Sequence, residues 1–274
     1  MNFIQNDIIK KYEIIDGQEL ILGDCLEVLK TFEPNSIDTI ITSPPYNLGI
    51  KYNTYNDKIE SEKYLTLIEN VFTECKRVLT DTGSIFLNIG GTNVDPFVPY
   101  NVIFRLKEFL VLQNNIIWIK SISIDKDSYG HYQPINSLRF LNNMYEHIFH
   151  LTKNGKVTIN RKAIGVPFKY KCNMEAKTVT EDIRCRGNTW FIPYETIQTK
   201  SQRGDHPATF PKKLVEWCIK LSNGKTILDP FLGTGTTLMV SRDLNCKGIG
   251  IEIDEKYFLF AKDKLSKVDG ILKC

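Results

Sequence analysis

A short apolar run at residues 37–41 is followed by the sequence Ser43-Pro44-Pro45-Tyr46. The run at residues 37–41 is typical of a buried strand, and it must end here because Pro44 and Pro45 cannot donate hydrogen bonds to a neighbouring strand. Ser43 brings a hydroxyl oxygen, the Pro44 carbonyl is a second acceptor held in place by the proline rings, and Tyr46 adds a flat ring. Two acceptors and a stacking surface suit an aromatic amine.

A second candidate site lies near the C-terminus, where residues 226–244 have the order strand, glycine turn, helix. Gly233 and Gly235 would let the backbone approach a ligand closely at the start of that helix. A dinucleotide fingerprint requires a third glycine where this chain has Leu238, and a P-loop requires a lysine where it has Thr236. The turn therefore predicts a ligand site that is not a phosphate cradle.

Acidic residues end the two strands beside that turn. Asp229 closes the first strand, and Glu252 closes the next at a position where a carboxylate can accept hydrogen bonds from ribose hydroxyls. Each has an alternative role, Asp229 as a turn residue and Glu252 as a solvated strand end, but the spacing favours a shared task. An acid-lined site favours a positively charged nucleoside, and S-adenosylmethionine, with its sulfonium and ammonium groups, fits that description.

A methyl donor of this kind suggests a specific chemistry for the residues around Ser43. The exocyclic amine of cytosine or adenine is a poor nucleophile because its lone pair is delocalised into the ring. Acceptors on both N–H groups, from Ser43 Oγ and the Pro44 carbonyl, would draw the nitrogen towards tetrahedral geometry and aim its lone pair at the methyl group. Tyr46 would then offer its face to a base flipped out of a duplex. Positioning would supply most of the rate, and no covalent intermediate is required.

The elements that must hold these residues alternate between strand and helix. Apolar runs bounded by turn residues predict strands at 19–24, 36–43, 83–90, 114–120, 225–230 and 245–254. Helical periodicity predicts helices at 64–79 and 98–109, with further helical segments in the C-terminal part. This alternation predicts an α/β fold with a doubly wound, mostly parallel sheet.

Two stretches interrupt the alternation. Residues 121–143 are polar and turn-rich, and residues 153–205 have mixed charge and no clear period. Residues 153–203 contain eleven Lys/Arg against four Asp/Glu, a net charge of +7, whereas the rest of the chain has 24 against 28 and carries −4. Because phosphate neutralisation dominates affinity for nucleic acids, this asymmetry predicts an inserted subdomain that binds a polyanion, with a solvated basic loop as the alternative.

The composition is that of an ordinary soluble protein, with 42% hydrophobic and 24% charged residues among 274. The first seventeen residues contain no uninterrupted apolar run of signal or membrane length, which predicts a cytoplasmic protein with no membrane partner. Seven cysteines without a CxxC pair argue against a disulfide framework and a zinc ribbon. Cys172 and Cys185 lie in the basic segment without a second close pair, so no metal site is predicted.

Two motifs resemble those of a known family. TSPPYN resembles the catalytic motif of the amino-methylating DNA methyltransferases of restriction-modification type, and DPFLGTG resembles their S-adenosylmethionine loop. The catalytic motif precedes a variable region and then the cofactor motif, which is the order of the family's beta group. The resemblance extends from LILGDCLEVL to GIGIEIDEKYF. It implies the methyltransferase fold in three parts: a catalytic part at 1–152, a target-recognition insert at 153–205 and a cofactor-binding part at 206–274.

The resemblance also implies roles for individual residues. The target-amine site would consist of Ser43, Pro44, Pro45 and Tyr46. The cofactor site would include Asp24, His206, Asp229, Phe231, Gly233, Gly235, Thr236 and Glu252. Two of these segments have compatible local roles: Asp24 suits the N-cap of a helix beginning at Cys25, and Pro211, in the segment that begins at His206, suits the first turn of a helix.

Double-stranded DNA is the partner that the resemblance implies, with a homodimer and a companion restriction endonuclease as further candidates. The residues expected to contact DNA are Lys169, Lys171, Arg184, Arg186 and Arg203. Trp190 is expected in the core. The histidines His131, His147 and His150 have no spacing that suggests a metal or a general base.

The resemblance implies cytosine N4 as the target, with adenine N6 as the alternative. Within the family, Ser at the first motif position favours cytosine N4, whereas Asp or Asn favours adenine N6. A methyltransferase for a protein or a small molecule is an alternative that would not need the basic insert, and RNA is a further alternative substrate. A non-catalytic DNA-binding module is another alternative, but it would give the SPPY motif, Asp229 and Glu252 no function.

Overall fold

The computed structural model describes residues 8–47, 58–93, 95–130, 136–169, 182–193 and 210–267. The strands are β1 (Ile9–Ile15), β2 (Gln18–Gly23), β3 (Ile37–Thr42), β4 (Leu79–Ile89), β5 (Val111–Ile119), β6 (Ile122–Ile124), β7 (Asp127–Tyr129), β8 (Tyr145–Thr152), β9 (Thr189–Phe191), β10 (Thr226–Asp229) and β11 (Lys247–Glu252). The helices are α1 (Cys25–Lys30), α2 (Ser61–Val78), α3 (Val98–Leu106), α6 (Lys212–Ser222), α7 (Thr236–Asp243) and α8 (Glu255–Ser266).

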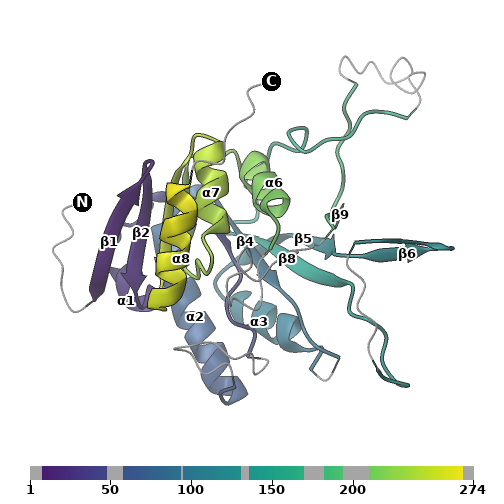
Figure 1. Cartoon of the computed structure of the whole chain (residues 1–274), viewed down its shortest axis with the longest axis horizontal. Coiled ribbons are helices and arrows are strands. Elements are labelled where there is room, and N and C mark those ends of the chain that lie inside the picture. Colours follow the sequence, from purple (N-terminus) through teal and green to yellow (C-terminus); the bar gives the residue numbers. More distant parts are fainter. Residues whose placement is uncertain are drawn as a thin grey trace.

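Nine of the strands form one mixed sheet in the order β1-β2-β11-β10-β3-β4-β8-β5-β9 (Figure 1). The five strands from β2 to β4 in this order are parallel to one another. An antiparallel β1 lies beside β2, and β8 lies antiparallel between β4 and β5. The mostly parallel α/β sheet predicted from the sequence is confirmed, because helices connect most of the parallel strands.

Helices cover both faces of the sheet, as expected for a doubly wound fold (Figure 1). On one face α1, α2 and α3 bury a cluster that includes Phe72 and Val102. On the other face α6 packs its Trp217 against Trp190, with the rings 5.4 Å apart and nearly perpendicular. Trp190 is 1% exposed, which confirms its predicted place in the core. Among the described helices, none is both long enough and apolar enough to span a bilayer.

The carboxyl ends of four adjacent parallel strands meet at one edge of the sheet. Leu228 of β10 pairs with Ile40 of β3, and Glu252 of β11 pairs with Leu22 of β2. Segments far apart in sequence therefore end side by side, and the residues that follow them face the same space. Parallel sheets place their ligand sites at such an edge, where neighbouring connections leave in opposite directions.

Several predicted boundaries were wrong by a few residues. The helix predicted at 64–79 begins at Ser61 and ends at Val78, because the chain extends into β4 at Leu79. The helix predicted at 98–109 ends at Leu106. Strands β1, β8 and β9 of the main sheet and the short strands β6 and β7 were not predicted. β1 carries several charged residues on a partly exposed edge strand, and β8 is buried at six consecutive positions, so its sequence lacks the alternation of a half-exposed strand.

The two irregular stretches differ in how they join the sheet. Within residues 121–143, β6 and β7 form a two-stranded hairpin that projects beyond the main sheet (Figure 1). Within residues 153–205, the described parts pack on the main sheet. Strand β9 pairs with β5, and Ile164 and Ile192 are buried in the same hydrophobic cluster as Trp217 of α6. The segment predicted to have no clear period therefore supplies an edge strand of the sheet.

Candidate active site

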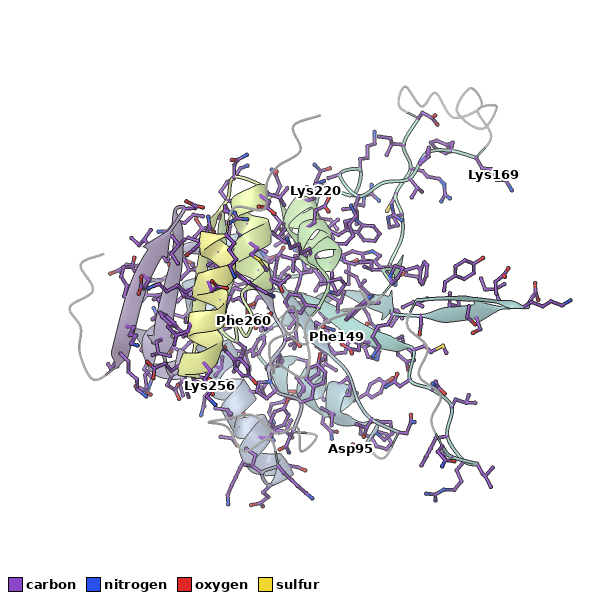
Figure 2. The ribbon with its side chains drawn as sticks, in the orientation of Figure 1. Asp95, Phe149, Lys169, Lys220, Lys256 and Phe260 are labelled. Atoms are coloured by element: carbon purple, nitrogen blue, oxygen red, sulfur yellow. The ribbon has the colours of Figure 1, made fainter. Side chains whose placement is uncertain are left out.

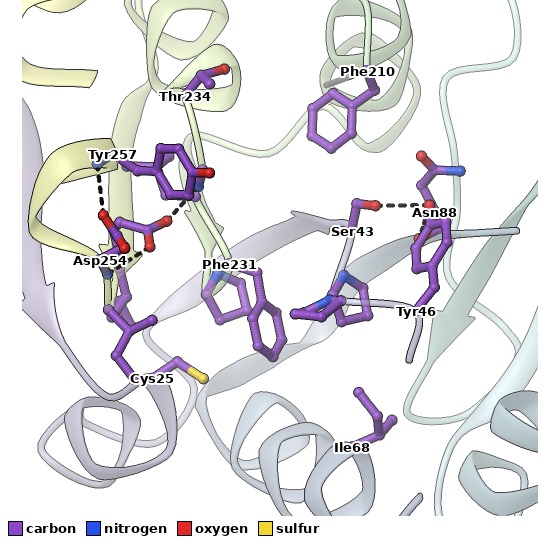
Figure 3. A pocket seen from close by; sticks show the side chains of 18 of the residues that line it. Cys25, Ser43, Tyr46, Ile68, Asn88, Phe210, Phe231, Thr234, Asp254 and Tyr257 are labelled. Carbon is purple, nitrogen blue, oxygen red and sulfur yellow. Dashed lines mark hydrogen bonds between the residues drawn. The ribbon is translucent and has the colours of Figure 1, made fainter. Parts of the chain in front are cut away.

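A cavity of about 280 Å³ opens at the edge where the parallel strands end. Figure 3 shows its two ends, with Asp254 and Tyr257 on one side, Ser43 and Tyr46 on the other, and Phe231 between them. The lining also includes Asp24, Cys25, Pro44, Pro45, Asn88, Trp118, Glu146, Phe210, Gly233, Thr236 and Glu252. Nine of the lining residues were predicted from the sequence, for two separate sites, and the fold brings them to one cavity.

At one end, Ser43 and Tyr46 are held by a short turn after β3. The Ser43 Oγ and Tyr46 Oη atoms lie 2.9 Å apart. Tyr46 Oη also lies 3.1 Å from Glu146 Oε2, and burial together with that carboxylate raises the pKa of the Tyr46 phenol well above its usual value. Within the described part of the chain, no donor is bonded to the Pro44 carbonyl. Two oxygens are thus available to an incoming amine, those of Ser43 and Pro44.

At the other end, Glu252 fastens the glycine turn to the strand beside it. Its carboxylate accepts hydrogen bonds from the Gly233 amide at 2.7 Å and from the Asp254 amide at 2.8 Å. The side chain is 8% exposed, and burial raises the pKa of Glu252 to about 7. Each carboxylate oxygen retains a lone pair, so Glu252 can accept further hydrogen bonds from a ligand in the cavity.

The glycine turn needs the backbone conformations that only glycine adopts easily. Gly233 and Gly235 have φ values of +57° and +83°. A Cβ atom on Gly235 would lie 2.9 Å from the Cβ of Ala261 in α8, so a side chain at this position would force α7 and α8 apart. Gly235 is the N-cap of α7 and does not line the cavity, whereas Gly233 and Thr236 do. The turn therefore contributes Gly233 and Thr236 to the cavity wall, and Gly235 allows the close packing of α7 and α8 behind it.

Asp229 lies behind the cavity wall and is absent from its lining. It is 1% exposed and accepts hydrogen bonds from Thr42 Oγ1 at 2.8 Å, Thr237 Oγ1 at 2.6 Å and the Phe231 amide at 3.1 Å. Burial raises its pKa to about 6, although these three donors oppose the shift. Asp229 thus ties the end of β3 to the turn that follows β10. Its expected contact with the cofactor stays a prediction.

Asp24 has the capping geometry expected from the sequence. Its side chain accepts a hydrogen bond from the Leu26 amide at 2.8 Å at the start of α1, and the residue also lines the cavity. Phe231 lines the cavity between its two ends. The predicted cofactor residue His206 lies outside the described residues. Helix α6 begins at Lys212, and Pro211 is its N-cap instead of lying in its first turn.

The predicted DNA contacts fall into three groups. Lys169 and Arg184 are exposed, and Figure 2 shows Lys169 far from the sheet. Arg186 instead packs its guanidinium 4.1 Å from the centre of the Trp217 ring and donates to the Ile164 carbonyl. It braces the insert against α6, which limits its reach towards a partner. Two further candidates, Lys171 and Arg203, lie outside the described residues.

The described histidines have structural partners. His150 is fully buried between Asn114 and Ser84 and stacks on Phe86, and burial lowers its pKa to about 4. His147 bonds to Asn115. His131 lies outside the described residues. Across the described ranges, no group of three His, Cys, Asp or Glu side chains is placed to hold a metal ion.

Sequence reasoning missed two polar residues at the Ser43 end, Asn88 and Glu146. Asn88 stands near the end of β4 in the run FLNIG, where a polar side chain among apolar ones was a readable signal. Glu146 stands near the beginning of β8, which runs antiparallel and therefore starts at the edge where its neighbour β4 ends. No local pattern identified this position, because strand β8 itself was not predicted.

Comparisons with known proteins agree with this geometry. Residues 37–263 match the family model for N6/N4 methyltransferases, described as DNA methylase. The Type II methyltransferase M.HpaI of Haemophilus parainfluenzae is 33% identical over 251 residues, covering 90% of this chain and 74% of that protein. The DNA adenine methyltransferase YhdJ of Escherichia coli K12 is 28% identical over 254 residues, covering 88% and 80%.

Solved structures share the fold. The cytosine-N4-specific PvuII DNA methyltransferase superposes with a TM-score of 0.70 at 17% identity, covering 96% of this chain and 92% of that one. The Thermus thermophilus modification methylase TTHA0409 in complex with S-adenosylmethionine gives a TM-score of 0.60 at 22% identity, covering 89% and 91%.

The fold is therefore that of the S-adenosylmethionine-dependent methyltransferases. More narrowly, the chain belongs to the DNA methylase family of N6/N4 methyltransferases, and its activity is that of a DNA amino-methyltransferase. The methyl donor of this class is S-adenosylmethionine. The acidic, partly apolar end of the cavity fits such a donor, because Glu252 can accept from hydroxyls and Phe231 offers an apolar face.

Proposed function

We propose that this protein is a site-specific methyltransferase that modifies the exocyclic N4 amine of cytosine in duplex DNA. One observation carries the proposal: a single cavity joins an acidic end, at Glu252 and Asp24, to an amine-binding end at Ser43 and Pro44. A donor bound at the first end would face an acceptor bound at the second. This arrangement suits direct transfer, in which positioning provides most of the rate.

The cofactor end would be formed by residues at or just after the ends of three adjacent strands, β2, β11 and β10. Glu252 would accept hydrogen bonds from the ribose hydroxyls, and Asp24, directly after the neighbouring strand β2, would add negative charge. Phe231 would pack against the adenosyl portion, and Gly233 would allow the backbone to approach it. When bound, S-adenosylmethionine supplies a methyl group activated by the positive charge of its sulfur.

The base end would hold the amine by its two N–H groups, at Ser43 Oγ and at the Pro44 carbonyl. Both acceptors sit on one rigid turn, because Pro44 and Pro45 restrict the backbone on either side of that carbonyl. The ring of Tyr46 would stack with the base. To reach this buried turn, the target nucleotide must leave its duplex by flipping.

Cytosine N4 is preferred because Ser43 occupies the first position of the motif. Two relatives divide on this point, since the PvuII enzyme is cytosine-N4-specific and YhdJ is an adenine methyltransferase. Adenine N6 is therefore the second candidate.

Target recognition would reside in residues 153–205, between a catalytic part at 1–152 and a cofactor-binding part at 206–274. The +7 charge of this region, and the exposed Lys169 and Arg184 within it, support contact with DNA phosphates. Relatives named Type II methyltransferases support a restriction-modification role. A companion endonuclease and a homodimer would accompany that role.

Incubation of the protein with tritiated S-adenosylmethionine and unmethylated DNA, followed by nucleoside digestion and mass identification, tests the proposal. We expect N4-methylcytosine. Recovery of N6-methyladenine would keep the site and cofactor but reject the assignment of the base. Label on RNA or protein, with none on varied DNA sequences, would reject DNA as the substrate.

Cofactor affinity is expected to depend on pH through Glu252. Its pKa is raised to about 7, so the carboxylate gains a proton as the pH falls from 8 to 6 and becomes a poorer acceptor for ribose hydroxyls. The dissociation constant for S-adenosylmethionine should rise about tenfold over this range. Calorimetric titration at pH 6, 7 and 8 measures the effect.

The matched variant for this titration is Glu252→Gln, which keeps the shape of the side chain but cannot ionise. It should bind the cofactor more weakly and with a flatter pH profile. An equal pH dependence in both proteins would assign the titration to another group, such as Asp229, whose pKa is raised to about 6.

A further inference from the structure

We infer that Glu146 is a positioning residue that orients the Ser43 hydroxyl through Tyr46, so that the Ser43 oxygen faces the target amine as an acceptor only. This inference rests on the proposed function. A serine hydroxyl can donate a hydrogen bond as readily as it accepts one. The target amine, which has two N–H groups, needs Ser43 to act as an acceptor.

Glu146 is fixed on the sheet beside the base end of the cavity. It stands near the start of β8, its side chain is 15% exposed, and it lines the cavity. One carboxylate oxygen, Oε1, pairs with Lys120 Nζ at 2.9 Å. The other, Oε2, accepts from Asn88 Nδ2 at 2.9 Å and lies 3.1 Å from Tyr46 Oη. A carboxylate paired with a lysine and an amide donor is an acceptor towards Tyr46.

The direction of each hydroxyl hydrogen follows from the number of hydrogens and acceptors around the Tyr46 oxygen. Tyr46 has a single hydroxyl hydrogen, and besides Ser43 its oxygen approaches Glu146 Oε2 at 3.1 Å and the Asn88 carbonyl at 3.3 Å. Neither of those two atoms carries a hydrogen, so the Tyr46 hydrogen points towards them. The 2.9 Å contact between Tyr46 and Ser43 must therefore use the hydrogen of Ser43.

The consequence concerns the lone pairs of Ser43. With its only hydrogen directed to Tyr46, the Ser43 oxygen presents lone pairs alone to the cavity. The chain from Glu146 through Tyr46 to Ser43 thus gives a neutral hydroxyl the behaviour of a dedicated acceptor. Hydrogen bonds in such a chain also polarise one another, which strengthens the acceptor at its end.

Glu146→Gln tests this chain directly. An amide nitrogen facing Tyr46 would donate to its oxygen and disturb the hydrogen direction at Ser43. We expect the single-turnover rate of methyl transfer to fall about ten- to a hundredfold, the range for losing a charge-assisted hydrogen bond. The dissociation constant for S-adenosylmethionine should be unchanged, because Glu146 lies at the other end of the cavity. An unchanged rate would overturn the inference.

Glu19→Gln provides a matched control. Glu19 also pairs with a lysine, Lys247 at 2.6 Å, is 12% exposed and is hydrogen-bonded to a tyrosine, Tyr12, but it lies outside the cavity lining. Its loss should affect stability without lowering the transfer rate. A comparable drop in rate for both variants would show a general effect on the sheet and overturn the inference for Glu146.

A double-mutant cycle separates positioning from simple structural support. In a Tyr46→Phe background the chain is already cut, so Glu146→Gln should lower the rate by less than about twofold. If the two losses multiply, Glu146 does not act through the Tyr46 hydroxyl.

Neutron diffraction from deuterated crystals tests the hydrogen directions without any activity. The Ser43 deuterium should point at the Tyr46 oxygen. A Tyr46 deuterium pointing at Ser43 would overturn the inference even in an active enzyme. A wild-type protein that labels no base would instead reject the proposed function and leave the observed hydrogen directions as they are.

Discussion

Ser43→Ala is expected to lower the single-turnover rate of methyl transfer about a hundred- to a thousandfold, which brings it near the background of a radiolabel assay. The substitution removes one of the two acceptors on the target amine, and losses of this size are typical when a preorganised polar partner is removed from a reacting group. Cofactor binding should survive, because Ser43 lies at the opposite end of the cavity from Glu252. Calorimetry and single-turnover kinetics on the same preparation measure the two effects.

Ser36→Ala is the control for this prediction, since the Ser36 hydroxyl donates to the Glu33 carbonyl and the residue is absent from the cavity lining. It should leave both cofactor binding and rate unchanged. Tyr46→Ala should lower the rate at least as far as Ser43→Ala, since it removes the ring as well as the hydroxyl. Loss of cofactor binding with retained transfer in Ser43→Ala would overturn the assignment of the two ends.

Asp229→Ala is expected to lower the free energy of unfolding by about 3 kcal/mol and to weaken cofactor binding. The carboxylate satisfies three donors in a site that is 1% exposed, and each buried donor left without a partner costs about 1–3 kcal/mol, although the two threonine hydroxyls can turn elsewhere. Because those donors belong to β3, α7 and the Phe231 turn, the cavity wall loosens with the fold. Chemical denaturation and calorimetric titration measure the two losses.

Asp229→Asn distinguishes hydrogen bonding from charge. It keeps an acceptor of the same size, so it should retain the fold and most cofactor affinity. The pKa of Asp229 is raised from 3.8 to about 6, so its contribution to stability is greatest below pH 4 and is lost as the pH rises through 6. Asparagine should remove that pH dependence. If Asp229→Ala weakened cofactor binding without any change in unfolding, a direct ligand contact would replace the bracing role.

Local sequence signals determined a large part of this protein. Prolines that cannot continue a ladder set the end of β3, and Asp24 capped α1 as expected. Glycines at positive φ formed the turn before α7, as the pattern of residues 226–244 predicted. These features depend on a few neighbouring residues, so they could be read without the fold. The alternation of strands and helices extended the prediction to a mostly parallel sheet.

Only the tertiary structure decided which side chains meet. Glu146 reaches Tyr46 because β8 enters the sheet antiparallel beside β4, a pairing between residues about 60 positions apart that no local periodicity reports. Asp229 faces inward to Thr42 and Thr237 rather than into the cavity, because the packing of β3 against β10 surrounds it with donors. A local sequence pattern can identify a candidate functional side chain. The direction in which that side chain points, and its partners, depend on contacts between segments that are distant in sequence.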